Sequence, residues 1–163
     1  MKKIQLLFFS ALFVFIALKT VVAAPPDVTV QHKDGIGNYL ADVNGRTLYW
    51  SKNDSPGKSA CIGSCAEKWP PFFSGAILSA SPYMNAGEFG VIERADGKKQ
   101  NTFRGFPLYY YSVDIRPGDT AGHNLGSVWF VIDPEKFKPP VKEYYGLGSM
   151  DEAKKGSKGG SKE

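Results

Sequence analysis

The sequence predicts an all-β domain in which two sequence-related units form one small sandwich or partly open barrel. Two hairpin-forming dipeptides, Asn44-Gly45 and Asp96-Gly97, each lie between short apolar runs. The 18 glycines and 11 prolines leave little room for long helices. Each unit is too small to bury its own apolar face, so we expect the two to share one core of roughly seven to nine short strands.

The elements follow in order along the chain. The first hairpin joins NYLADV to RTLYWS through Asn44-Gly45, and the second joins EFGVIERA to KKQNTFRG through Asp96-Gly97. CAEKW, which begins at Cys65, predicts one helical turn between them. PLYYYSV, from Pro107, is a further predicted strand. SVWFVI, from Ser127, is a continuous apolar run typical of a strand buried on both faces.

An internal repeat relates the two units. Matching residues lie sixty positions apart, or sixty-one after an insertion at Ile115. The matched pairs are Gly45 and Gly105, Leu48 and Leu108, Tyr49 and Tyr109, Asp54 and Asp114, Pro56 and Pro117, Gly57 and Gly118, Ser59 and Thr120, and Ala60 and Ala121. Each copy then closes with a tryptophan, Trp69 or Trp129. The repeat predicts a pseudo-symmetric pair of β units.

The first 23 residues are typical of a signal peptide. Two lysines precede an apolar run from Ile4 to Leu18, and VVA before Ala24 suits cleavage. The run ends at Lys19 and is shorter than the ~20 residues that a membrane span needs. No cysteine lies near the cut, so we expect no diacylglyceryl anchor. The predicted location is periplasmic or secreted, with no stable membrane anchor after signal removal.

Charge excludes two classes of partner. Removal of Lys2, Lys3 and Lys19 with the signal lowers the formal net charge from +4 to +1. A chain so nearly neutral has no global field to attract nucleic acid or an anionic membrane.

The predicted domain spans residues 24–145, with copy one at about 35–73 and copy two at about 88–133. Residues 146–163 are rich in Gly, Ser and Lys and predict a disordered tail.

The two copies together resemble the secreted-repeat family of predicted bacterial lipoproteins, which is defined by a Tyr-x-aromatic-x-x-Asp motif. The similarity runs from about Gly35 to Asp133. The second copy carries the whole motif and the first lacks its central aromatic, where Ser51 stands; the motif residues present are Tyr49, Asp54, Tyr109, Tyr111 and Asp114. The resemblance implies an exported module of unknown function, in a family that is sometimes joined to electron-transfer domains.

Cys61 and Cys65 are the only cysteines, and three interpretations stay open. Outside the cytoplasm such a pair normally oxidises, and Ile62-Gly63-Ser64 can supply the turn that a disulfide requires. This structural disulfide is the interpretation that we favour. A redox pair lacks the CxxC spacing and βαβ pattern of thioredoxin-like enzymes.

The third interpretation is a copper site. Soft thiolates select Cu(I), and a CxxxC pair with a distant histidine is a ligand set of exported copper chaperones. The additional ligands on offer are His123, Met84 and His32. His123 is the best placed of them, because Gly122-His123 occupies the position of Cys61-Ile62 in the repeat.

The aromatic residues predict packing and also offer a binding surface. Tyr109 and Tyr111 share one face of a strand, which favours cross-strand packing in a small core. Trp69 and Trp129 are the candidates for an aromatic platform that binds a ligand or a partner. Asp54 and Asp114, ahead of SPG and RPGD, are expected to accept backbone N–H bonds in turns.

These patterns favour an exported, non-enzymatic binding or accessory module of the cell envelope. No histidine lies in a recognisable nucleophile motif, so we expect neither an enzyme nor a cofactor. The expected partner is an unidentified envelope protein or small ligand. The alternative is a copper-binding or electron-transfer accessory protein that uses Cys61 and Cys65.

Overall fold

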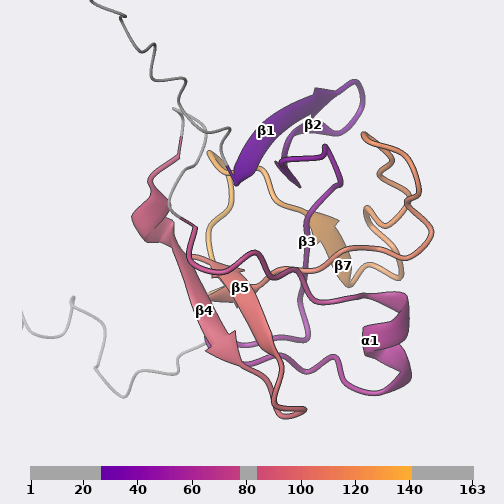
Figure 1. The fold of residues 1–163 in the computed structure, drawn as a ribbon. Coiled ribbons are helices and arrows are strands. Elements are labelled where there is room, and N and C mark those ends of the chain that lie inside the picture. Colours follow the sequence, from indigo (N-terminus) through magenta and orange to yellow (C-terminus); the bar gives the residue numbers. More distant parts are fainter. Residues whose placement is uncertain (1–26, 78–83, 141–163) are drawn as a thin grey trace, which may run out of the picture.

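The structure is a computed structural model that describes residues 27–77 and 84–140 (Figure 1). The predicted signal peptide and tail lie outside the described residues. Short strands dominate what is described, and helix is almost absent. The strands are β1 (Val28–Lys33), β2 (Gly37–Asp42), β3 (Tyr49–Ser51), β4 (Phe89–Glu93), β5 (Lys99–Phe103), β6 (Phe106–Pro107) and β7 (Trp129–Val131). They form three small antiparallel sheets, ordered β1-β2, β3-β7 and β4-β5-β6, that do not close into a barrel. The all-β class is therefore confirmed.

The first hairpin differs from the sequence prediction in its partner strand. β2 pairs along its length with β1, from Val28 opposite Asp42 to Lys33 opposite Gly37. The Asn44-Gly45 turn does return the chain, but only one bridge follows it, between Ala41 and Thr47. Strand β3 then leaves to pair with β7, which belongs to the other copy. Burial against that copy outweighs local pairing here.

The second hairpin forms as predicted. β4 and β5 pair around the Asp96-Gly97 turn, and the two-residue β6 continues the sheet beyond β5. The predicted strand from Pro107 is short, and its continuation is a pair of bridges from Tyr109 to Tyr49 and to Pro71. In β7, Trp129 and Phe130 are half-buried and only Val131 is buried. That strand is therefore less enclosed than its apolar run predicts.

A pseudo-two-fold relation joins the copies through Tyr49 and Tyr109. The N–H of each tyrosine donates to the carbonyl of the other, at 2.8 Å and 2.9 Å. The end of each copy adds to strands of the other: the Leu40 N–H donates to the Ile132 carbonyl, and the Asn101 N–H to the Phe72 carbonyl, at 2.9 Å and 2.8 Å. The copies are thus intertwined rather than stacked.

The interior has two apolar clusters. One, which we call the aliphatic cluster, contains Val28, Leu40, Leu48, Phe72, Ile77, Phe103, Phe106, Leu108, Ile132 and Phe137. The other, the aromatic cluster, contains Tyr39, Ala41, Tyr49, Cys61, Trp69, Tyr109, Tyr111 and Val131. Both draw on the two copies, so the shared core that the repeat predicts is present.

Two short helices interrupt the strands. α1 (Ser64–Lys68) is the single helical turn that the sequence predicts from Cys65, and it begins one residue earlier. The 3₁₀ helix η1 (Ala86–Glu88) begins with a capping box, in which Asn85 and Glu88 bond each other's backbone N–H groups. Within residues 27–77 and 84–140, no helix has the length and apolar character to cross a membrane.

Candidate functional site

The motif side chains meet across the pseudo-two-fold relation. The hydroxyl of Tyr49 donates to Oδ2 of Asp114 at 2.5 Å, and the hydroxyl of Tyr109 donates to Oδ2 of Asp54 at 2.8 Å. Each tyrosine therefore bonds the aspartate of the other copy. Both tyrosines and both aspartates are buried. The missing aromatic at Ser51 does not disturb this exchange.

The second oxygen of each aspartate holds the following loop. Oδ1 of Asp54 accepts the N–H of Ala60 at 2.7 Å, and Oδ1 of Asp114 accepts the N–H of Ala121 at 3.0 Å. Because the repeat pairs Ala60 with Ala121, these two bonds are equivalent. Each motif aspartate thus fixes the loop of its own copy and the tyrosine of the other.

Burial controls the electrostatics of these pairs. It raises the pKa of Asp54 to about 6, although the Ala60 N–H, the Tyr109 hydroxyl and Arg94 all lower it. Burial also raises the pKa of Asp114. The pKa values of the Tyr49 and Tyr109 hydroxyls are raised well above the usual range, by burial first and then by the neighbouring carboxylates. Both phenols therefore remain protonated donors.

Two tryptophans stack at the centre of the aromatic cluster. The rings of Trp69 and Trp129 lie 3.8 Å apart and 6° from parallel. Tyr49 and Trp69 form a T-shaped pair at 5.5 Å, and so do Tyr109 and Trp129 at 5.1 Å. Tyr111 stacks on Trp69 at 4.3 Å. Trp69 is buried and Trp129 half-buried, so of the two predicted platform residues only Trp129 presents part of its ring to solvent.

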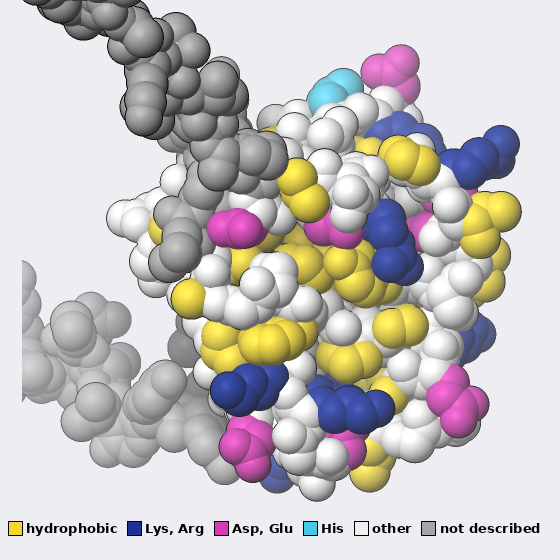
Figure 2. All heavy atoms as spheres, in the orientation of Figure 1, with side chains coloured by type: hydrophobic (Ala, Val, Ile, Leu, Met, Phe, Trp, Pro, Cys, Tyr) yellow, Lys and Arg dark blue, Asp and Glu magenta, His cyan; other side chains and the backbone are white. Residues whose placement is uncertain are grey.

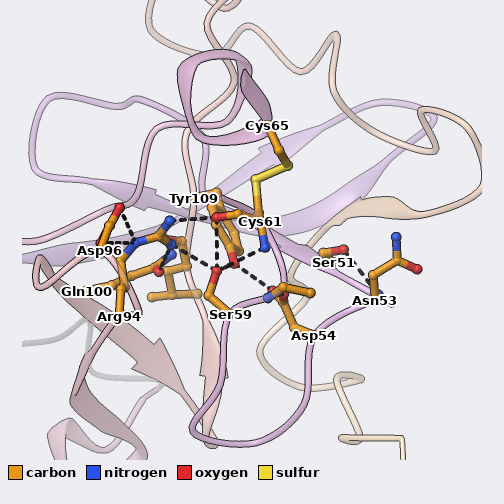
Figure 3. Close-up of a disulfide and its surroundings, with 12 residues drawn as sticks. Ser51, Asn53, Asp54, Ser59, Cys61, Cys65, Arg94, Asp96, Gln100 and Tyr109 are labelled. Atoms are coloured by element: carbon orange, nitrogen blue, oxygen red, sulfur yellow. Dashed lines mark hydrogen bonds and ion pairs between the residues drawn. A yellow bond between two sulfur atoms is a disulfide. The ribbon is translucent and has the colours of Figure 1, made fainter. Parts of the chain in front are cut away.

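Cys61 and Cys65 form a disulfide, with 5.2 Å between their Cα atoms. Beside it lies the buried guanidinium of Arg94 (Figure 3), which comes from the end of the β4–β5 hairpin. Its Nη2 donates to the carbonyl of Cys61 at 2.6 Å, and its Nη1 donates to Gln100 Oε1 at 2.5 Å and to Ser59 Oγ at 2.9 Å. Ser59 Oγ lies 2.7 Å from the Tyr109 hydroxyl. One network therefore connects the disulfide loop to a motif pair.

A comparison with known protein families identifies the family of this chain. The chain matches the sequence model of a family described as a secreted repeat of unknown function, at residues 28–72 and again at residues 90–133. The two matches together cover more than half of the chain. It belongs to this family. Comparison with curated proteins and with solved structures gave no match.

In this secreted repeat, the predicted copper ligands lie in different parts of the fold. His32 lies on the exposed β1–β2 hairpin, where Nδ1 is 2.9 Å from Asn38 Oδ1. His123 accepts the N–H of Val131 through Nδ1 at 3.3 Å, and burial lowers its pKa. Met84 packs against the aliphatic cluster, whereas Cys61 lies in the aromatic one. Among the described residues, no three His, Cys, Asp or Glu side chains are grouped so as to hold a metal ion.

Sequence reasoning about the secreted repeat missed Arg94, Gln100 and Ser59. All three are polar residues near a turn, which ordinarily predicts exposure, and yet Arg94 and Gln100 are buried. Gln100 also donates to the Leu108 carbonyl at 2.6 Å, so it links Arg94 to the strand that leads to Tyr109. The sequence pattern holds no signal for this network, because its partners lie far apart along the chain.

Proposed function

We propose that this secreted repeat is a non-enzymatic module that acts by binding, with an unidentified protein or small ligand of the cell envelope as its partner. The observation that supports the proposal most is that both hydrogen-bonded pairs, Tyr49–Asp114 and Tyr109–Asp54, are buried in the interior. Groups that could do acid–base chemistry are committed to holding the two copies together. The proposed place of action is outside the cytoplasmic membrane, in the periplasm or the medium.

The surface supports binding in a second way. Val43, Val113 and Ile115 are exposed, and Ile115 keeps 83% of its surface accessible. They belong to two loops that meet where the Gly118 N–H donates to the Gly45 carbonyl at 3.0 Å. Separately from these loops, hydrophobic side chains reach the surface in the middle of the face that Figure 2 shows, with Lys and Arg side chains near them. Apolar residues exposed in this way favour an interaction surface.

Site-specific photo-cross-linking in the producing cells tests the proposal. A photoreactive phenylalanine replaces Ile115 in one variant, and Lys98, an exposed residue of the β4–β5 turn, in the control. We expect one discrete adduct from position 115 and none from position 98. If positions 115 and 98 gave the same adducts, or if neither gave an adduct, binding through these loops would be contradicted.

Variants of the Tyr–Asp motif test whether the motif itself takes part in binding. Tyr109→Phe and Asp54→Asn should leave the position-115 adduct unchanged wherever the variant is folded. Loss of the adduct in a folded variant would instead make the motif a functional site.

A titration with Cu(I) tests the copper-handling alternative. Stoichiometric binding of Cu(I) by the reduced protein, and loss of that binding in the Cys61→Ser variant, would favour this alternative.

A further inference from the structure

The disulfide is not needed to build its own loop. Copy two makes the equivalent turn with Gly122 in place of Cys61, and it still brings Trp129 to the ring of Trp69. The flanking hydrogen bonds also agree, since the Ser112 N–H donates to the Lys68 carbonyl and the Lys52 N–H to the Val128 carbonyl, both at 3.0 Å. A loop as short as that between the cysteines contributes only about 2 kcal/mol through chain entropy. Stabilisation alone is a weak reason for this bond.

The two sulfur-bearing residues differ in access. Cys61 is 3% exposed and packs in the aromatic cluster, whereas Cys65 is partly exposed. Between them lie three exposed residues, and one of these, Ile62, keeps 57% of its surface accessible. Of the two cysteines, Cys65 is therefore the more accessible to an attacking thiolate. Ile62 offers an exposed apolar side chain in the same loop.

A buried cation adjoins the protected half of the bond. Arg94 donates to the Cys61 carbonyl at 2.6 Å, and its other close acceptors, Gln100 and Ser59, are neutral. Its ion pair is with Asp96, at 3.3 Å, whose side chain is one-third exposed. Negative charge that develops on the Cys61 sulfur would therefore form in the residue whose carbonyl this guanidinium binds. Such a neighbour favours departure of a thiolate.

We propose that Cys61–Cys65 is a thiol–disulfide exchange site that accepts two electrons from a dithiol protein outside the cytoplasm. A partner thiolate attacks Cys65 Sγ, the Cys61–Cys65 bond breaks, and its electron pair passes to Cys61 Sγ. The partner's second thiolate then attacks the partner sulfur of the mixed disulfide and releases Cys65. The partner leaves as a disulfide, and its two thiol protons end on Cys61 and Cys65. This activity goes beyond the proposed binding role and does not depend on it.

The rate at which each cysteine forms a mixed disulfide tests which sulfur is accessible to exchange. The full exported chain is prepared as Cys61→Ser, which leaves Cys65 alone, and as the matched control Cys65→Ser. Each is incubated with glutathione disulfide and weighed by mass spectrometry. We expect the Cys65 thiol to form the glutathione adduct at least about tenfold faster than the Cys61 thiol. Equal rates, or a faster adduct on Cys61, would overturn the proposal.

The rate of reduction tests whether the bond opens in the folded protein. Dithiothreitol should reduce the wild-type disulfide much faster than the chain unfolds, as measured by tryptophan fluorescence in the same buffer. Arg94→Gln should slow reduction about threefold or more, and Arg46→Gln, which alters an arginine stacked on Tyr110, should not. Reduction that proceeds only at the unfolding rate would make the bond a buried staple and refute the exchange site. The single-cysteine variants keep Arg94, so they decide the question even where Arg94→Gln does not fold.

Discussion

At the scale of single residues, the exchange of partners between Tyr49 and Tyr109 dominates the interior. A phenol that donates to a buried carboxylate is a strong hydrogen bond, and its removal leaves the carboxylate without that donor. Each motif residue therefore stabilises the copy that it does not belong to.

Removal of either motif hydroxyl should destabilise the fold to a similar degree. We expect Tyr49→Phe and Tyr109→Phe each to lower the free energy of unfolding by about 1.5–3 kcal/mol. Tyr111→Phe is the matched control, because that hydroxyl makes no hydrogen bond to another described residue, and it should change stability by less than about 0.5 kcal/mol. Urea unfolding measures all three. If Tyr111→Phe lowered the free energy of unfolding as much as the two motif variants do, the stabilising role of the motif hydroxyls would be contradicted.

The raised pKa of Asp54 predicts a pH-dependent contribution to stability. Its folded pKa of about 6 exceeds the unfolded value of 3.8, so the folded state binds the proton first. This contribution is complete below the unfolded pKa and is lost as pH rises through about 6.

The comparison variant is Asp54→Asn, which cannot titrate. Relative to it, the wild type should gain about 2.4 kcal/mol between pH 7 and pH 4. Urea unfolding of both proteins at several pH values measures the gain. A constant difference between them across that range would show that Asp54 titrates normally.

Part of this site was predictable from the sequence. The repeat and the family motif singled out the two tyrosines and two aspartates as a set. They did not reveal that each tyrosine reaches the other copy, because spacing along the chain carries no information about which copy lies opposite. Arg94 was missed for a related reason, since only the fold brings a turn residue of copy two to Cys61 of copy one.

At the scale of elements, the loops after the motif aspartates differ between copies in one important position. Copy one carries the side chain of Cys61 there, whereas copy two has Gly122. A Cβ on Gly122 would lie 2.8 Å from Trp69 Cη2 and 3.0 Å from Tyr49 Cε1. The tryptophan stack therefore requires a residue without a side chain on this side.

Gly122→Ala should consequently disturb the stack. We expect a loss of about 1–3 kcal/mol in the free energy of unfolding, because the added methyl overpacks the aromatic cluster. The near-ultraviolet circular dichroism of the two tryptophans should change at the same time. Unaltered dichroism together with unaltered stability would mean that the rings shift without cost.

The elements also show where local pattern is a reliable guide. The β4–β5 hairpin and α1 formed as predicted, because their signals are contained within a few consecutive residues. The pairing of β3 with β7 was not predicted, since its two strands lie almost eighty residues apart and their match depends on burial. Strand β1 was likewise missed, although Val28, Thr29 and Val30 are typical strand residues.

At the scale of the whole molecule, the two copies share one interior. Each supplies strands to the other's sheets, and both apolar clusters draw on both copies. Neither copy alone retains the partner of its motif tyrosine.

A chain that holds only residues 24–77 should therefore lack a cooperative unfolding transition, whereas the complete protein should unfold in one. Tryptophan fluorescence and far-ultraviolet circular dichroism, followed through a urea titration, should give coincident curves for the complete protein. Two separated transitions, or a folded single copy, would contradict the intertwined arrangement.

The mutual bonds of Tyr49 and Tyr109 have the geometry of a symmetric homodimer whose subunits are joined in one chain. In a homodimer every substitution appears twice, once in each subunit. Fusion removes that constraint, so one half can change while the other preserves the shared core. In one half the Cys61 carbonyl binds Arg94, and in the other Gly122 lies against Trp69; no symmetric pair of identical chains could carry this divergence.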